Sequence, residues 1–98
     1  MKIIWTPTAR RTYFLTLEYL DETWTKREIQ KFVDKVENVL NQIQDDPYMF
    51  EASKKKQNVR KGLITKKNIL YYRIKPRKQV IELITFWDSR QNPKNLPY

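Results

Sequence analysis

The stretch TKREIQKFVDKVENVLNQIQDD, residues 25–46, carries the clearest structural pattern in this chain. It opens with Thr25 and Glu28 at the spacing of a capping box, in which the threonine hydroxyl and the glutamate carboxylate satisfy free backbone amides of the first helical turn. Apolar residues then recur at intervals of three and four, as on one face of a helix. They are Ile29, Phe32, Val33, Val36, Leu40 and Ile43. Asp45-Asp46-Pro47 ends the pattern, so the stretch predicts an amphipathic helix of about four turns.

A second helix is predicted just before this one. The chain starts with a short β-prone run at residues 2–5, and the Thr-Pro-Thr that follows is typical of a helix entry with Thr8 as the N-cap. From residue 9 to about residue 22, apolar side chains recur at helical spacing, although Thr12 and Thr16 are poor helix formers. These apolar residues are Tyr13, Phe14, Leu17 and Leu20. Only a couple of residues separate the two helices, which predicts an antiparallel helical hairpin.

Three β-like runs follow a loop at residues 47–58 that has neither period. The runs cover residues 59–65, 69–74 and 79–87, with polar turns at 66–68 and 75–78. Short polar turns between such runs predict successive antiparallel hairpins. We therefore expect a single α+β domain over residues 1–98, in the order β-α-α-β-β-β, with the helical hairpin packed on a small, mainly antiparallel sheet. Residues 92–98 should form an extended C-terminal tail.

Composition limits the chemistry, because the chain has no cysteine and no histidine. Disulfides, thiolate metal sites and the usual general base near neutral pH are excluded, and we expect neither a metal nor a cofactor. Catalysis would have to rely on lysine, arginine, tyrosine or carboxylate side chains. No apolar run approaches the roughly 20 residues of a membrane span, and no signal peptide is visible. We expect a cytoplasmic protein without a membrane partner.

The net charge of +9 is concentrated in one third of the chain. Residues 1–52 carry 7 basic and 9 acidic side chains, residues 53–81 carry 11 basic and no acidic ones, and residues 82–98 carry two of each. A segregated positive field attracts polyanions, which favours a surface for nucleic acid or an acidic partner over a merely solubilising one. The loop triplet Lys54-Lys55-Lys56 belongs to this segment and fits either interpretation on its own.

Element order and three phrases make the chain resemble the RelE/ParE superfamily of bacterial toxins, and its ParE-like, plasmid-stabilisation members in particular. The phrases are TPTARRTYFLTLEYLDETW over the first helix, VRKGLITKKNILYYRIK over the central hairpin and IELITFWDSRQNPKNL near the end. The resemblance covers nearly the whole chain. It implies a bacterial toxin of a type II toxin–antitoxin pair, held inactive by a cognate antitoxin, with a homodimer and a toxin–antitoxin hetero-oligomer both open.

The branches of the superfamily differ in their target. The resemblance implies cleavage of mRNA in the ribosomal A site for a RelE-like member, and inhibition of DNA gyrase without an established catalytic site for a ParE-like member. The hypotheses for this chain are therefore a metal-independent, ribosome-dependent endoribonuclease, an inhibitor that binds gyrase, and an inactive nucleic-acid-binding relative.

Candidate site residues follow from the resemblance and from the chemistry of RNA cleavage. Attack by a 2′-hydroxyl needs a base and cations for the phosphorane, and the fork of donors on arginine suits phosphate oxygens. The RelE pattern places an arginine after the last strand and basic residues in the first strand of the meander, which carries over to Arg90, Arg60 and Lys61. Tyr98 is the candidate base if the tail folds back. The candidate residues for contact with nucleic acid or another target are Lys54, Lys55, Lys56, Arg60, Lys61, Arg73 and Arg90.

Two departures from the RelE pattern favour binding over cleavage. Where those enzymes hold an arginine early in the middle strand, this chain has Ile69, and Arg73 follows only four residues later. The chain also lacks the histidine or tyrosine expected at a fixed spacing after Arg90, a spacing that falls near Leu96. We therefore expect a ParE-like toxin that inhibits gyrase by binding, with mRNA cleavage as the alternative.

The aromatic and acidic residues near Arg90 are expected to be structural. Trp87 should pack at the end of its strand, and Asp88 should pair with Arg90 or cap a turn. Of Tyr71 and Tyr72, the alternation of side chains along a strand directs one toward the helices.

Overall fold

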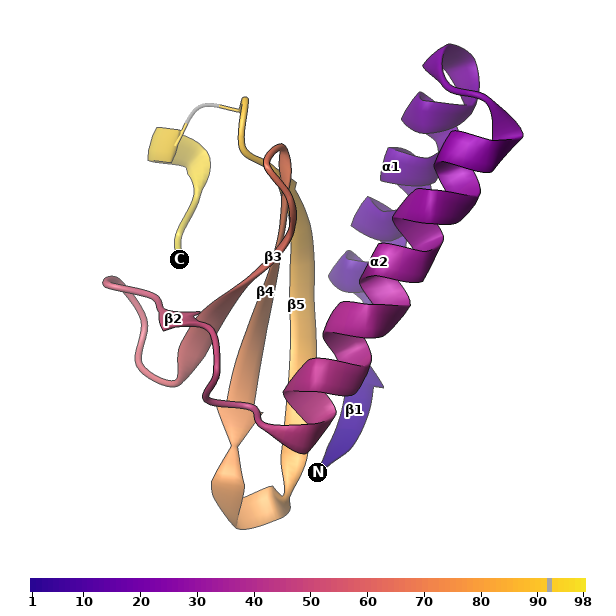
Figure 1. The fold of residues 1–98 in the computed structure, drawn as a ribbon. Helices are drawn as coiled ribbons and strands as arrows, with labels where there is room; N and C mark the ends of the chain where they lie inside the picture. The colour runs from indigo at the N-terminus through magenta and orange to yellow at the C-terminus, as the bar shows by residue number, and fades with distance from the viewer. Residues whose placement is uncertain (92) are drawn as a thin grey trace.

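Two helices pack against one face of a five-stranded sheet in the computed structural model, which describes residues 1–91 and 93–98 (Figure 1). The elements are β1 (Lys2–Trp5), α1 (Pro7–Thr23), α2 (Lys26–Asp45), β2 (Glu51–Ala52), β3 (Val59–Thr65), β4 (Asn68–Lys75) and β5 (Val80–Asp88), with short 3-10 turns at Pro76–Lys78 and Pro93–Asn95. The predicted α+β class and the helical hairpin are confirmed. One strand is added, because the two residues of β2 lie in the segment predicted as a loop.

The sheet runs in the order β1-β5-β4-β3-β2. β1 pairs in parallel with β5, and all other neighbours are antiparallel. β1 pairs with β5 only from Val80 to Leu83, whereas β5 continues to Asp88. On this edge no described strand pairs with the second half of β5. That half lies beside α1 instead, and this arrangement positions the site described below.

Both helices begin at a threonine cap. In α2, the Thr25 hydroxyl accepts the Glu28 N–H and the Glu28 carboxylate accepts the Thr25 N–H, each at 3.2 Å, which confirms the predicted capping box. In α1 the prediction of Thr8 as the cap is wrong. Thr6 is the N-cap, and its hydroxyl accepts a backbone N–H of the first turn at 3.0 Å. The cause is Pro7, whose fixed φ suits the first helical position, so the helix starts directly after Thr6.

The main core lies between the helices and the inner face of the sheet. The buried residues of α2 are Phe32, Val36, Val39 and Ile43, and those of the sheet are Ile64, Leu70, Tyr72, Ile74, Ile81, Leu83 and Phe86. The predicted stripe of α2 omits Val39 and includes Val33 and Leu40, which are only half-buried. The buried face of α2 is therefore rotated slightly from the predicted one.

A second, smaller cluster covers the outer face of the sheet. Val59, Tyr71 and Ile84 are buried there, and Leu96 and Tyr98 of the tail pack against them. The predicted extended tail therefore differs from the structure, in which Pro93–Asn95 forms a 3-10 turn and the chain comes back over the sheet (Figure 1). Residue 92 of that predicted tail lies outside the described residues. This second cluster explains why both central tyrosines are buried, with Tyr72 facing the helices and Tyr71 the tail.

Candidate functional site

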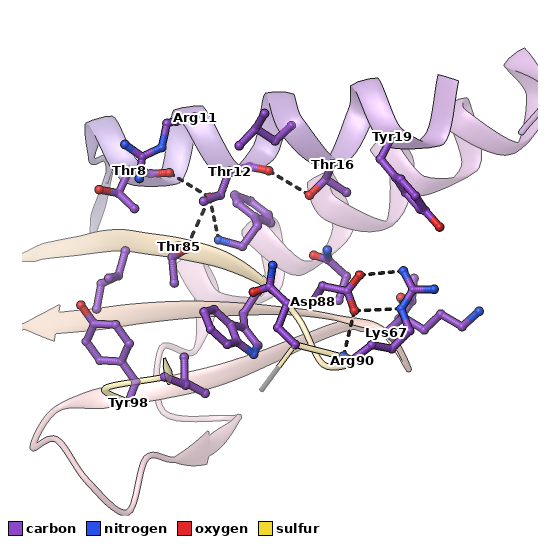
Figure 2. A pocket seen from close by; sticks show the side chains of 18 of the residues that line it. Thr8, Arg11, Thr12, Thr16, Tyr19, Lys67, Thr85, Asp88, Arg90 and Tyr98 are labelled. Carbon is purple, nitrogen blue, oxygen red and sulfur yellow. Dashed lines mark hydrogen bonds and ion pairs between the residues drawn. The ribbon is translucent and has the colours of Figure 1, made fainter. Parts of the chain in front are cut away.

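A groove of about 940 Å³ lies between α1 and the second half of β5 (Figure 2). One wall is a row of α1 side chains that includes Arg11, Leu15 and Tyr19. The other wall is formed by β5, by the turn between β3 and β4, and by the tail residues that end at Tyr98. Among the described helices, none is both long enough and apolar enough to cross a membrane.

Threonine side chains join α1 to the unpaired edge of β5. The Thr6 hydroxyl donates to the Ile84 carbonyl at 3.1 Å. The Thr12 hydroxyl accepts the Phe86 N–H at 2.9 Å and donates back to the Thr8 carbonyl at 2.8 Å. These bonds supply the edge of β5 with the partners that a sixth strand would otherwise provide. The first turns of α1 are thereby fixed against the sheet, and the groove continues along the later turns (Figure 2).

The later turns of α1 leave large apolar side chains open to solvent. Leu15 is 55% exposed and Tyr19 is 49% exposed, and both line the groove. Phe14, on the adjacent face of the helix, is 63% exposed. Contiguous exposed apolar side chains on a small monomer mark an interaction surface more often than isolated ones do.

Arg90 and Asp88 form a pair where β5 ends, beside the groove (Figure 2). Arg90 donates from Nε and Nη2 to the two carboxylate oxygens of Asp88 at 3.0 and 2.6 Å, and its backbone N–H also donates to this carboxylate. Its guanidinium carbon lies 5.7 Å from the centre of the Tyr19 ring. The hydrogen bonds from Arg90 lower the pKa of the Asp88 carboxyl, and the same pairing raises the pKa of Arg90. The expected pairing of these two residues is confirmed.

Arg60 lies on the inner face of the sheet, because it is paired with Tyr72 across the β3–β4 ladder. Its Nη1 donates to the carbonyls of Tyr48 and Phe50 at 3.0 and 2.7 Å, in the segment that follows α2. The Tyr72 hydroxyl donates to the Pro47 carbonyl of the same segment at 2.7 Å, and burial raises the pKa of Tyr72 to about 12. Arg60 and Tyr72 thus hold the connection between α2 and β2.

Tyr98 stacks on Tyr71 over the outer face of the sheet, with the ring centres 5.7 Å apart. Lys55 donates from Nζ to the Leu96 carbonyl at 3.0 Å, so one lysine of the basic triplet holds the tail. Burial raises the pKa of the Tyr71 hydroxyl. Trp87 is half-buried in the same cluster, as predicted for a strand end.

The other predicted contact residues are distributed over the outer face and its adjacent loop. Lys54 and Lys56 are exposed in the loop before β3, and Lys61 is half-buried opposite Tyr71. Arg73 also lies on the outer face, opposite Glu82 and 3.6 Å from its carboxylate. The structure therefore places most of the candidate cations on one side of the sheet, but not Arg60.

The three candidate catalytic residues are not all brought together: Arg90 and Tyr98 both line the groove, whereas Arg60 does not. Arg60 and Tyr98 lie on opposite faces of the sheet. Arg90 lies at the opposite end of the sheet from Arg60. It follows Asp88, which pairs with Asn68 of β4, and Asn68 pairs with Thr65 at the end of β3, five residues after Arg60. Five residues of strand span roughly 17 Å. Among the described residues there is also no group of three acidic side chains that could hold a metal ion.

Sequence reasoning missed the contribution of α1 to the site. Thr12 and Thr16 indicated only a weak helix, whereas Thr12 is the partner of the β5 edge. Tyr19 lies four residues after Leu15, so both fall on one helix face, and that spacing was the available signal. That spacing alone does not identify a binding surface, because apolar side chains four residues apart on a helix are more often buried in the core.

The model of the ParE toxin family of type II toxin–antitoxin systems, parDE, matches residues 3–93. The chain belongs to this family. Two solved structures share its fold. A YoeB/ParE toxin from Agrobacterium tumefaciens superposes with a TM-score of 0.67 at 19% identity, over 90% of this chain and 98% of the other. The YoeB dimer from Staphylococcus aureus gives 0.58 at 17% identity, over 89% and 94%. No curated protein matches the chain.

The predicted resemblance to the RelE/ParE superfamily is thus confirmed for family and fold. This ParE-family toxin has the element order of its structural relatives, and the matched residues 3–93 include α1, α2 and every strand except the first residue of β1. At under 20% identity the two solved structures bear on the fold alone.

Proposed function

We propose that this toxin inhibits growth by binding its target, that the target is DNA gyrase, and that a cognate antitoxin neutralises it. Support comes from the position of Arg60, which lies on the opposite face of the sheet from Tyr98 and at the opposite end from Arg90, while Arg90 and Tyr98 both line the groove. General acid–base cleavage requires its groups within hydrogen-bonding reach of one reacting phosphate. An inhibitor that acts by binding needs only a complementary surface.

The existing partners of the two arginines favour the same proposal. Arg60 already donates to two backbone carbonyls, and Arg90 donates from two nitrogens to Asp88. These bonds fix the orientation of each guanidinium, and Asp88 already neutralises the charge of Arg90. The alternative, ribosome-dependent cleavage of mRNA, would therefore require a rearranged site.

Assays with purified gyrase test this proposal directly. Adding the toxin should block supercoiling of relaxed plasmid and accumulate cleaved DNA, and a cognate antitoxin should restore supercoiling. Replacing both Lys54 and Lys56 by glutamine should weaken inhibition if this exposed loop contacts the target, and Lys55 is kept because it holds the tail. The double variant Arg10→Gln, Arg27→Gln removes two exposed charges from the helices and is the control for the loss of charge. Normal supercoiling together with new mRNA ends in a primer-extension assay on translating ribosomes would establish the endoribonuclease instead. Normal growth after expression without antitoxin would contradict any toxic activity.

We further propose a cytoplasmic location and assembly with the antitoxin as a hetero-oligomer. The solved structure of a YoeB dimer from Staphylococcus aureus makes a homodimer the alternative. Light scattering on the toxin alone and on the toxin–antitoxin complex distinguishes the two assemblies.

A further inference from the structure

Arg73 and Lys75 share one carboxylate on the outer face of the sheet. Lys75 donates from Nζ to Glu82 Oε2 at 3.1 Å, and Arg73 Nη1 lies 3.6 Å from Glu82 Oε1. The β4–β5 register places them, because Arg73 is aligned with Glu82 and Lys75 is on the same face two residues further along β4. The side chains of both cations are 36% exposed and that of Glu82 is 23% exposed, so all three can be reached from solvent.

Glu82 is unusual for its place in the chain. The 29 residues before it, 53–81, contain 11 basic side chains and no acidic one. Each oxygen of Glu82 faces a different cation, so the two cations are already arranged to receive a carboxylate. With Glu82 present, this group of three side chains carries a net charge of +1, whereas the two cations alone would carry +2.

Two of these three charged side chains also line the groove beside α1. Arg73 and Glu82 both line it, together with apolar side chains such as Leu15, Ile84 and Tyr98. A polypeptide segment that carries an acidic side chain next to apolar ones is complementary to a lining of this kind. A sugar-phosphate chain would leave much of the apolar lining without a partner.

We propose that Arg73 and Lys75 form a carboxylate-binding site that Glu82 occupies in the free toxin, and that an acidic, apolar-anchored segment of a protein partner binds there by displacing Glu82. Glu82 is then a specificity-determining residue. A partner gains the two cations only if it places a carboxylate where Glu82 lies, so a negative charge elsewhere on the partner is not enough. Binding at this site concerns how a partner is held and not what the toxin inhibits, so a negative gyrase assay leaves it standing.

The test measures binding of a fluorescently labelled peptide of alternating glutamate and leucine by anisotropy at low salt. Glu82→Gln should tighten binding about two- to fivefold, the effect expected when exposed ion pairs are released for a ligand. Glu22→Gln, at an exposed position near the end of α1, makes the same change in net charge and should leave the affinity unchanged. Adding Lys75→Gln to Glu82→Gln should cancel the gain. Raising the salt concentration should reduce all these differences.

Two results would overturn the proposal. The first is a Glu82→Gln affinity no tighter than wild type, or a gain matched by Glu22→Gln. The second is an equal gain for a single-stranded oligothymidylate, which would indicate a general positive field and a nucleic-acid partner. If Glu82→Gln does not fold in a thermal melt, Lys75→Gln gives an independent test. It must weaken peptide binding relative to Lys78→Gln, which removes an exposed cation from the following 3-10 turn.

Discussion

Arg60 shows how the role of one residue depends on which face of a strand it occupies. Its guanidinium donates to the Tyr48 and Phe50 carbonyls and lies 5.2 Å from the centre of the Tyr48 ring. Hydrogen bonds from a charged donor stabilise more than neutral ones. The main role of Arg60 is therefore to attach β3 to the segment after α2. Its contribution to the positive field is secondary.

Replacing Arg60 should therefore cost stability. Arg60→Ala leaves two carbonyls without their donor, and we expect the free energy of unfolding to fall by about 1–2 kcal/mol in urea denaturation. Arg60→Lys should recover only part of the loss, because one ammonium on a flexible stem does not reproduce the planar guanidinium. Lys56→Ala in the exposed loop is the control and should change stability by less than about 0.5 kcal/mol. Equal stabilities of Arg60→Ala and Lys56→Ala would show that the hydrogen bonds of Arg60 do not stabilise the fold.

Asp88 gives the fold a predictable pH dependence. Its pKa is lowered in the folded protein by the hydrogen bonds from Arg90. A carboxyl with a lowered folded pKa stabilises the fold above its unfolded pKa of about 3.9, and this contribution is lost as the pH falls through the folded pKa. Asp88→Asn should therefore melt at a lower temperature than wild type at neutral pH, and the difference should shrink below about pH 4. Circular dichroism melts between neutral and acid pH measure this. A difference that stayed constant down to about pH 2 would show that the carboxylate charge is not its source.

Helix α1 takes the place of a neighbouring strand along the second half of β5. Thr12→Val keeps the shape of the side chain but removes the acceptor of the Phe86 N–H, and we expect a loss of about 1–3 kcal/mol in the free energy of unfolding. Thr16→Val is a matched control, because the Thr16 hydroxyl donates only to a carbonyl of its own helix. Hydrogen exchange of the Phe86 amide should accelerate in Thr12→Val alone. Equal effects of the two substitutions would exclude the edge contact as the cause.

Sequence periodicity predicts the elements whose signals are local. The capping box at Thr25 and the β-like runs joined by short polar turns at residues 66–68 and 75–78 are local signals, so they identify the hairpin and the meander without knowledge of the fold. β2 could not be found this way, because its two residues form a strand only by pairing with Lys61 and Arg60. The partners of Arg60 and the hydroxyl bond of Thr12 were equally hidden, since each joins groups brought together by the completed fold.

At the scale of the whole molecule, the run of 11 cations does not become one surface. Arg60 faces the helices, Arg73 and Lys75 pair with Glu82 on the outer face, and Lys67 lies in the turn at the far end of the sheet beside Asp88 (Figure 2). The number of cations counted along residues 53–81 therefore overstates the positive field at any one place on the folded surface. What the fold concentrates instead is a combination of cations and exposed apolar side chains along the groove.

The tail completes the outer face of the sheet, and its contribution can be isolated. Tyr98→Ala removes the ring that stacks on Tyr71, and we expect a loss of about 0.5–1.5 kcal/mol in the free energy of unfolding, the range of aromatic pairs. Tyr98→Phe keeps the stack and should stay close to wild type. Lys55→Ala removes the bond to the Leu96 carbonyl and releases the same segment. Because both substitutions detach one tail, the double variant should lose less than the sum of the two single losses in urea denaturation. Strict additivity would mean that Lys55 and Tyr98 act independently, and that the last residues do not cover the sheet as one unit.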